Sequence, residues 1–347
     1  MTVDFAPGAT GTDEVLFARQ GSLGRVRLHR PQAINALTHE MVLAMHAQLE
    51  AWAADDSVTA VVLDGAGERG LCAGGDIRAL RTQIMDGDRC AATAFWADEY
   101  RLNALVHRYP KPYAALMTGV VMGGGVGVSA YGSLRLVTAD ARVAMPETGI
   151  GFFPDVGSLY LLSRAPGELG THLALSGSTI GGADAVHCGL ADAVVDPTDL
   201  PGVVERLAAG EAVEAATVGD VAPGSGLSGA RSWIDGCYAG EDPQAVLAAL
   251  RTHPAEPARA AAEVVASRSP MSVAVTLEAI RRAATMSTLE EVLGQDRALG
   301  EAFLESSDFL EGVRALLVDK DHDPRWAPAT LEEVSAEAVQ ALFGVSG

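Results

Sequence analysis

Residues Val58-Thr59-Ala60-Val61-Val62-Leu63 form an apolar, β-branched run that predicts a buried strand. The run ends at Asp64-Gly65-Ala66-Gly67, whose glycines are typical of a turn. Upstream, Thr38 is expected to cap a helix. The apolar face of this helix is formed by Met41, Met45, Leu49 and Trp52. Before the helix, residues 15–29 predict two strands joined by a turn, and this order of elements predicts a mixed sheet covered by helices, an α/β fold.

The sequence predicts strands and helices up to about residue 205 and almost only helices after it. Further short strands are predicted at residues 113–117, 134–137, 142–144 and 191–195. After residues 210–228, which are rich in Gly, Ala, Ser and Val, helical patterns follow at residues 245–250, 257–267, 273–285, 289–304 and 312–318. We therefore expect an α/β core at 12–205, a connector at 206–228 and a helical C-terminal region at 229–347.

Composition and charge exclude several classes of function. The chain has 347 residues, of which 48% are hydrophobic and 20% charged, as is typical of a globular protein. No apolar run approaches the roughly 18 residues of a membrane span, and the first residues lack the basic and apolar regions of a secretory signal. We therefore expect a cytoplasmic protein that does not bind membranes.

The net charge of −20, from 45 acidic and 25 basic residues, argues against a nucleic-acid partner, because phosphate contacts need clustered Lys or Arg. A small phosphorylated ligand stays possible if a few Arg side chains are placed locally. The four cysteines have no Cys-x-x-Cys spacing and no clustered His beside them. We expect reduced, buried thiols and no metal site.

Two carboxylates, Glu147 and Asp155, lie in the otherwise apolar run of residues 144–157. Burying an unpaired charge is expensive, so such groups are solvated, paired or used in chemistry. They are therefore candidate acid, base or nucleophilic groups. Taken alone, the segment fits a structural alternative nearly as well. In that alternative one carboxylate caps a helix and the other pairs with an Arg such as Arg164.

Two glycine-rich loops offer backbone amides. Gly75 lies in the loop at residues 72–77, and Gly124 lies in Gly123-Gly124-Gly125. Two converging amides would form an oxyanion hole, although the first loop alone also fits an ordinary helix entry. Residues 125–130 also fit the loose dinucleotide pattern G-x-G-x-x-A, but weakly, and close packing is the simpler explanation.

Other sources of chemistry are weak. Glu99 lies in Asp98-Glu99-Tyr100, on an expected helix whose charges most simply form a solvated face. The sequence has no G-x-S-x-G elbow, no H-E-x-x-H helix and no P-loop. Carboxylates and backbone amides therefore remain as the candidate catalytic groups.

Four segments, taken in order and at their separations, resemble the crotonase (enoyl-CoA hydratase/isomerase) superfamily. They are residues 29–37, 72–77, 123–125 and 145–147. Within it, the chain is most similar to the 3-hydroxyisobutyryl-CoA hydrolase branch from about Val15 to Pro328. Residues 311–321, EGVRALLVDKD, are specific to that branch. The resemblance implies a crotonase-like core of repeated ββα units.

The resemblance also implies roles for individual residues. Glu147 and Asp155 correspond to the catalytic carboxylates, and Gly75 and Gly124 correspond to the oxyanion-hole donors. Glu99 corresponds to a residue that contacts the substrate near its acyl group. The turn at residues 30–35, which includes Ala33 and Asn35, would bind CoA, partly through backbone groups.

The activity implied is hydrolysis of a short 3-hydroxyacyl-CoA, foremost 3-hydroxyisobutyryl-CoA in valine catabolism, with no cofactor besides the CoA of the substrate. A homo-oligomer is possible. The alternative within the superfamily is an enoyl-CoA hydratase, but the second glutamate of that pattern falls on Gly127, which has no side chain. A nicotinamide-dependent oxidoreductase and a non-catalytic or RNA-binding scaffold are further alternatives.

Overall fold

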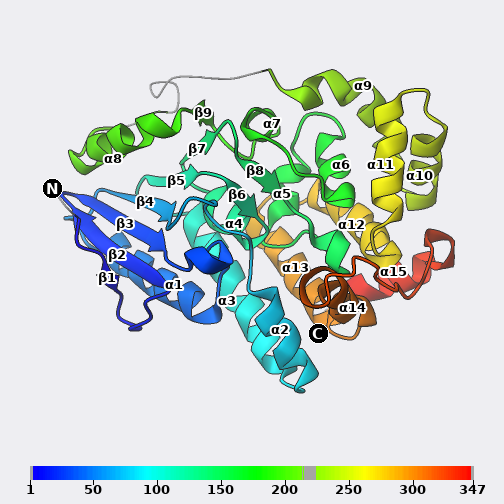
Figure 1. Ribbon diagram of the computed structural model, residues 1–347, viewed down its shortest axis with the longest axis horizontal. Coiled ribbons are helices and arrows are strands. Elements are labelled where there is room, and N and C mark those ends of the chain that lie inside the picture. Colours follow the sequence, from blue (N-terminus) through cyan, green and yellow to red (C-terminus); the bar gives the residue numbers. More distant parts are fainter. Residues whose placement is uncertain (1–2, 213, 215–223, 345–347) are drawn as a thin grey trace. The chain divides into compact units, whose positions relative to one another are not determined.

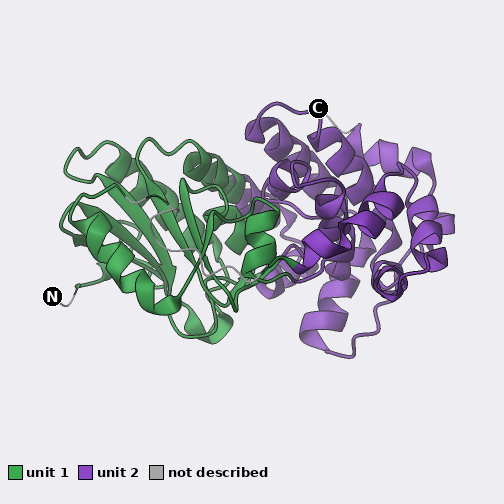
Figure 2. Ribbon diagram, turned by 90° about the horizontal axis from the view of Figure 1, so that it is seen from above, with its two compact units in different colours: residues 1–76, 98–143, 180–225 green, residues 77–97, 144–179, 226–347 purple. Residues whose placement is uncertain are grey.

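The structure is a computed structural model that describes residues 3–212, 214 and 224–344. It divides into two compact units (Figure 2). Unit 1 comprises residues 1–76, 98–143 and 180–225, and unit 2 comprises residues 77–97, 144–179 and 226–347. Each unit is built from segments far apart in the sequence. The predicted regions 12–205 and 229–347 stay a prediction, and residues 213 and 215–223 of the predicted connector lie outside the described residues.

Unit 1 contains a seven-stranded sheet with the order β1-β2-β3-β4-β5-β7-β9 (Figure 1). Its strands are β1 (Ala6–Pro7), β2 (Val15–Gln20), β3 (Leu23–Leu28), β4 (Ala60–Gly65), β5 (Tyr113–Met117), β7 (Leu134–Thr138) and β9 (Ala193–Val195). The first three strands pair antiparallel, and β3 to β9 pair parallel. A second, two-stranded sheet pairs β6 (Val120–Met122) with β8 (Arg142–Ala144).

Helices cover both faces of the large sheet. The helices of unit 1 are α1 (His39–Ala53), α4 (Gly124–Ser129), α7 (Gly182–His187) and α8 (Leu200–Ala208). On one face, α8 packs Val203, Val204 and Leu207 against the apolar side chains of the strands. On the other face, the ring of Trp52 from α1 lies on Gly24, so that a Cβ there would come within 2.7 Å of the ring. Each buried aliphatic side chain stabilises the fold by about 1.5–3 kcal/mol.

Unit 2 is mostly helical. Its helices are α2 (Ile77–Met85), α5 (Ser158–Leu162), α6 (Leu169–Ser176), α9 (Gly226–Tyr238), α10 (Pro243–Thr252), α11 (Glu256–Ala266), α12 (Pro270–Ala283), α13 (Leu289–Phe303), α14 (Ser307–Val313) and α15 (Ala336–Phe343). The long helix α3 (Arg89–His107) contributes residues to both units. An aromatic cluster of Trp96, Phe152, Phe153, Phe303 and Phe309 packs together in unit 2, with Trp96 stacked on Phe152 at 5.0 Å between ring centroids.

The α/β class and the helical C-terminal region predicted from the sequence are confirmed. The Thr38 cap is also confirmed, because its Oγ1 accepts a hydrogen bond from the Met41 amide at 3.2 Å. The strand predicted at residues 58–63 begins two residues later, at Ala60, where pairing with Leu23 of β3 starts. Helix α9 was not predicted, since three glycines interrupt its apolar pattern.

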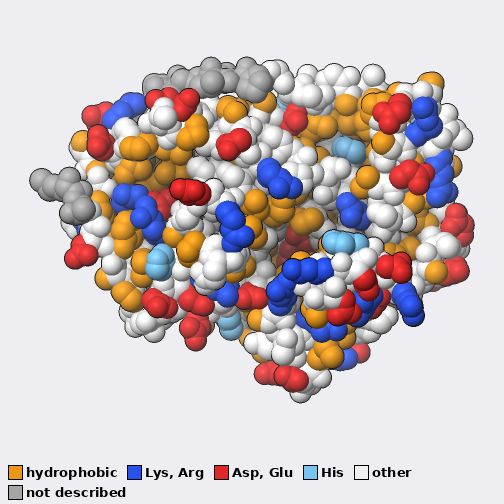
Figure 3. Space-filling model, in the orientation of Figure 1, with side chains coloured by type: hydrophobic (Ala, Val, Ile, Leu, Met, Phe, Trp, Pro, Cys, Tyr) orange, Lys and Arg blue, Asp and Glu red, His pale blue; other side chains and the backbone are white. Residues whose placement is uncertain are grey.

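The surface carries acidic and basic side chains interspersed on the face shown in Figure 3. All four cysteines are free thiols, and three of them are buried as expected. Cys90 is exposed at the start of α3, so the prediction of a buried thiol is wrong for this residue. Among the described residues, no helix combines the length and the apolar character needed to cross a membrane.

Candidate active site

Two loop glycines of unit 1 present their amides close together. Gly124 is the first residue of α4, and Gly123 before it adopts φ 50° and ψ −121°, a conformation that favours glycine. A methyl group on Gly124 would lie 3.5 Å from the Gly75 nitrogen. Neither amide donates a hydrogen bond within the part of the chain that the structure describes. Both N–H groups are therefore free to donate to an acceptor outside the described chain.

The loops that carry these amides are fixed by backbone hydrogen bonds. Leu37 donates to Gly74 O and accepts from the Asp76 amide, both at 2.8 Å. Cys72 accepts from the Met122 amide at 3.0 Å, which ties this loop to the strand before Gly124. A Cβ on Gly125 would lie 2.6 Å from Cys72 O. Close packing thus accounts for the glycine at residue 125, and the backbone hydrogen bonds preorganise the amides.

Glu99 on α3 lies beside Gly124. A methyl group on Gly124 would collide with Glu99 Oε1, so the carboxylate occupies the space next to the amide. Glu99 is only 2% exposed, and its assignment to a solvated helix face is wrong because this part of α3 is covered by the loops. Burial raises the pKa of the neighbouring Cys72 thiol to about 12, and the Glu99 charge adds to this shift, so Cys72 is an unreactive thiol.

The turn predicted to bind CoA begins with the 3-10 helix η1 (Pro31–Ala33) and continues through Ile34 and Asn35, both at positive φ. The Asn35 side chain is fully buried. Its Oδ1 accepts from the Arg30 amide at 2.9 Å. Its Nδ2 lies 3.0, 3.2 and 3.1 Å from the carbonyls of Ala66, Gly70 and Leu71. The Asn35 side chain therefore supports the turn, while Ala33 is partly exposed.

In unit 2, Glu147 begins the 3-10 helix η2 (Glu147–Ile150) and is 8% exposed. Glu147 O accepts from the Phe152 amide at 3.0 Å. The next residue, Thr148, accepts from the Ser269 amide at 3.1 Å and donates its hydroxyl to Leu175 O at 3.2 Å. Segments from α6 and the start of α12 therefore hold the backbone that carries the carboxylate.

Asp155 lies just before α5 and is 7% exposed. The N-cap residue of α5 is Gly157, and Arg164 donates to the carbonyls of Tyr160, Ala283 and Met286. Gly157 rather than Asp155 is therefore the N-cap residue of α5, and the acceptors of Arg164 named here are backbone carbonyls. Val156 adopts φ 53°, which costs about 1–3 kcal/mol for a β-branched residue and is typical of functional sites.

The sequence reasoning missed two buried acids of unit 2, Asp296 and Asp308, which are both fully buried. Asp296 Oδ2 accepts from the Gly157 amide at 2.7 Å. Asp308 accepts from the Ser269 hydroxyl at 2.6 Å and the Ala327 amide at 2.8 Å. The available signal was an acidic residue within an apolar helical stripe, as for Asp296 beside Val292 and Leu299.

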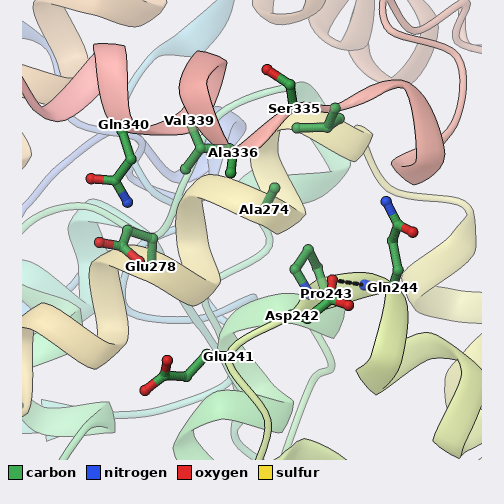
Figure 4. A pocket seen from close by; sticks show the side chains of 11 residues that line it. Glu241, Asp242, Pro243, Gln244, Ala274, Glu278, Ser335, Ala336, Val339 and Gln340 are labelled. Carbon is green, nitrogen blue, oxygen red and sulfur yellow. Dashed lines mark hydrogen bonds between the residues drawn. The ribbon is translucent and has the colours of Figure 1, made fainter.

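A separate pocket of about 300 Å³ lies in unit 2 between α10, α12 and α15 (Figure 4). Glu241, Asp242 and Glu278 line it, and none of the predicted site residues does. Its acidic lining would repel the phosphates of CoA. Among the described residues, no group of three or more His, Cys, Asp or Glu side chains could hold a metal ion.

The sheet of unit 1, with its paired loop amides, and the helical unit 2 define an enzyme of the crotonase fold class. The chain belongs to the enoyl-CoA hydratase/isomerase family, whose sequence pattern matches residues 23–343. A solved structure described as a carnitinyl-CoA dehydratase from Mycobacterium thermoresistibile is 49% identical, with a TM-score of 0.92 over 96% of this chain and 97% of that one. An enoyl-CoA hydratase from Rhodobacter sphaeroides 2.4.1 is 37% identical, with a TM-score of 0.91 and the same coverage.

Curated relatives extend the similarity to one particular activity. The mitochondrial 3-hydroxyisobutyryl-CoA hydrolase of Rattus norvegicus is 38% identical over 346 residues, which are 96% of this chain and 89% of the relative. The Homo sapiens protein of the same name is 36% identical over 343 residues, which are 95% of this chain and 88% of the relative. The resemblance to the superfamily and to this hydrolase branch is therefore confirmed.

Proposed function

We propose that the protein hydrolyses a short 3-hydroxyacyl-CoA thioester, foremost 3-hydroxyisobutyryl-CoA, to the free hydroxy acid and CoA. The observation that carries this proposal is the pair of free amides at Gly75 and Gly124, with the Glu99 carboxylate beside them. The nearly full-length similarity to curated hydrolases supports the choice of substrate. Such a step belongs to valine catabolism.

In the proposed mechanism, the thioester oxygen accepts hydrogen bonds from Gly75 and Gly124, which stabilise the negative charge that develops on it. Glu147 then attacks the carbonyl carbon to form a mixed anhydride with loss of the CoA thiolate, or it activates a water for direct attack. Asp155 positions the water or transfers the proton that the thiolate takes up. Both routes consume one water and release one CoA thiol.

Substrate recognition is proposed to use the remaining predicted residues. Glu99 lies beside the amide pair and would accept a hydrogen bond from the 3-hydroxyl group of the acyl chain. The backbone at Ala33 would contact CoA, on a turn that the buried Asn35 side chain holds in place.

The second candidate function is hydration of an enoyl-CoA. It is favoured by the solved relatives described as a carnitinyl-CoA dehydratase and an enoyl-CoA hydratase. Against it stands Gly127, which lies buried within α4 and which, by the resemblance to the superfamily, corresponds to the second glutamate of the hydratase pattern. An acid/base group contributes about a hundredfold or more to the rate, so hydration should be slow here.

The test is release of free CoA thiol from a panel of short 3-hydroxyacyl-CoAs, with loss of the enoyl absorbance measured in parallel for crotonyl-CoA. We expect thiol release from 3-hydroxyisobutyryl-CoA and at most slow hydration. Glu147→Gln should lower kcat at least about a hundredfold without changing the circular dichroism spectrum, because the change is nearly isosteric. Exposed Glu40→Gln on α1 is the matched control. Brisk hydration without thiol release would favour the second function.

We further propose a cytoplasmic location, no cofactor besides the CoA of the substrate, no nucleic-acid or membrane partner, and a possible homo-oligomer. The curated relatives are named as mitochondrial proteins, so the location needs its own measurement by cell fractionation. Activity that survives dialysis against a chelator would support the absence of a metal cofactor. Light scattering after size-exclusion chromatography would give the oligomeric state.

A further inference from the structure

Asp296 is a buried acid of unit 2 that the proposed mechanism does not use. It lies on α13, is fully buried, and its Oδ2 accepts a hydrogen bond from the Gly157 amide at 2.7 Å. Its Oδ1 is also buried and has no hydrogen-bond partner among the described residues. A buried carboxyl is costly unless it is paired or protonated, so its presence here needs a reason.

The turn that Asp296 holds is strained. Val156 adopts φ 53° and Gly157 adopts φ 72°, so two successive residues are left-handed directly after Asp155. A β-branched residue occupies this region only when its surroundings impose it. The hydrogen bond from Gly157 to Asp296 is a direct constraint on this turn. The direction of the Asp155 side chain depends on the same backbone.

The surroundings indicate that Asp296 is a neutral acid. Within the described residues, no ion pair links a basic side chain to Asp296, and Arg281 and Arg282 of the adjacent α12 pair instead with Glu168 and Glu278. Burial, followed by the nearby negative charge of the Asp155 carboxylate, raises the pKa of Asp296 well above its ordinary range. Burial and the nearby charge both favour the protonated, neutral form of Asp296.

We propose that Asp296 is a positioning residue for Asp155, which as a neutral carboxylic acid fixes the Val156–Gly157 turn. The inference rests on the proposed function, in which Asp155 acts on the water or the leaving thiolate. Asp296 itself touches no reacting atom. Its effect is on the orientation of Asp155, where a displacement of about 1 Å can lower the rate a hundredfold.

The test compares four variants in the thiol-release assay with 3-hydroxyisobutyryl-CoA. Asp296→Asn keeps the acceptor oxygen and has no charge, so it mimics the neutral acid. Asp296→Ala and the similarly sized Asp296→Leu remove the acceptor. The matched control is Gln295→Ala on the same helix, which removes one buried hydrogen bond, to Ala279 O at 3.2 Å, away from the turn.

We expect kcat to fall tenfold or more in the Ala and Leu variants, with KM changed less than threefold. The Asn variant and the Gln295 control should keep kcat within threefold of the unmodified enzyme. An Ala or Leu variant that folds and keeps full kcat would overturn the proposal. An Asp296→Asn variant with a kcat as low as that of the Ala and Leu variants would also overturn it. An equal loss of kcat in the Gln295→Ala control would do the same. If the Ala and Leu variants do not fold, the kcat of Asp296→Asn tests the proposal. A low kcat contradicts a neutral positioning acid, and a normal kcat supports it.

Asp155→Asn, measured in the same assay, separates this inference from the proposed function. If Asp155→Asn keeps full kcat, the role proposed for Asp155 itself fails. If Asp155→Asn is slow while the folded Asp296 variants are normal, only the positioning role of Asp296 fails. Melting temperatures of all variants show whether a loss of rate reflects unfolding.

Discussion

At the scale of single residues, the candidate oxyanion hole depends on the absence of a side chain. The Gly124 amide donates no hydrogen bond within the described chain. Glu99 Oε1 fills the space that a Cβ on Gly124 would occupy. The absence of a side chain at Gly124 leaves room for the Glu99 carboxylate beside the amide. A single methyl group at residue 124 must therefore move either the amide or Glu99.

Gly124→Ala is expected to lower kcat for 3-hydroxyisobutyryl-CoA by about a hundredfold or more, because the methyl group displaces either the amide or the Glu99 carboxylate beside it. The measurement is thiol release, with circular dichroism to check the fold. Gly202→Ala is the matched control, since this exposed glycine of α8 has nothing within 4 Å of a new Cβ. A folded Gly124→Ala enzyme with normal kcat would show that neither the position of this amide nor that of Glu99 limits the reaction.

At the scale of elements, helices α6 and α9 meet through aromatic side chains. His172 is buried, with its Nδ1 2.9 Å from the Tyr238 hydroxyl and its ring edge-on to Trp233. Burial lowers the pKa of His172 from its ordinary value of 6.5 to about 4. In the window between these two pH values the unfolded chain binds a proton that the folded protein does not, so stability is lost as the pH falls.

His172→Gln should remove this acid sensitivity. The unmodified protein is expected to lose up to about 3 kcal/mol of unfolding free energy between pH 6.5 and 4 through this side chain alone. The variant, which cannot titrate here, should show a smaller loss in urea unfolding at pH 7 and pH 4.5. The partly exposed His46→Gln on α1 serves as control. Equal pH dependence in the unmodified and His172→Gln proteins would contradict a buried neutral histidine.

At the scale of the whole molecule, the sequence predicted what is local and missed what depends on packing. The strand at residues 113–117, the Thr38 cap and the two glycine loops were readable because their patterns are short and continuous. The burial of Glu99 could not be predicted, because a charged residue in a helical pattern gives no sign of what covers it. Asp296 contacts a residue more than a hundred positions away in the sequence, and Asp308 contacts residues tens of positions away. No local periodicity encodes such contacts.

Asp308 shows how the C-terminal helices support a candidate catalytic residue. Its carboxyl joins the hydroxyl of Ser269, at the start of α12, to the amide of Ala327. The Ser269 amide in turn donates to Thr148 O, directly after Glu147. One buried acid thus connects Thr148 in η2 with Ala327, which lies nearly 180 residues later in the sequence.

Asp308→Ala should therefore lower both stability and rate. Loss of two hydrogen bonds to a buried acid is expected to cost about 2–4 kcal/mol, measured by urea unfolding. kcat should fall as well, because the Ser269–Thr148 contact is loosened beside Glu147. Asp308→Asn, which keeps one acceptor oxygen, should give intermediate values, and exposed Asp86→Ala should change stability by less than about 0.5 kcal/mol. If Asp308→Ala destabilises the protein but leaves kcat unchanged where it is fully folded, the C-terminal helices stabilise unit 2 without positioning the carboxylate.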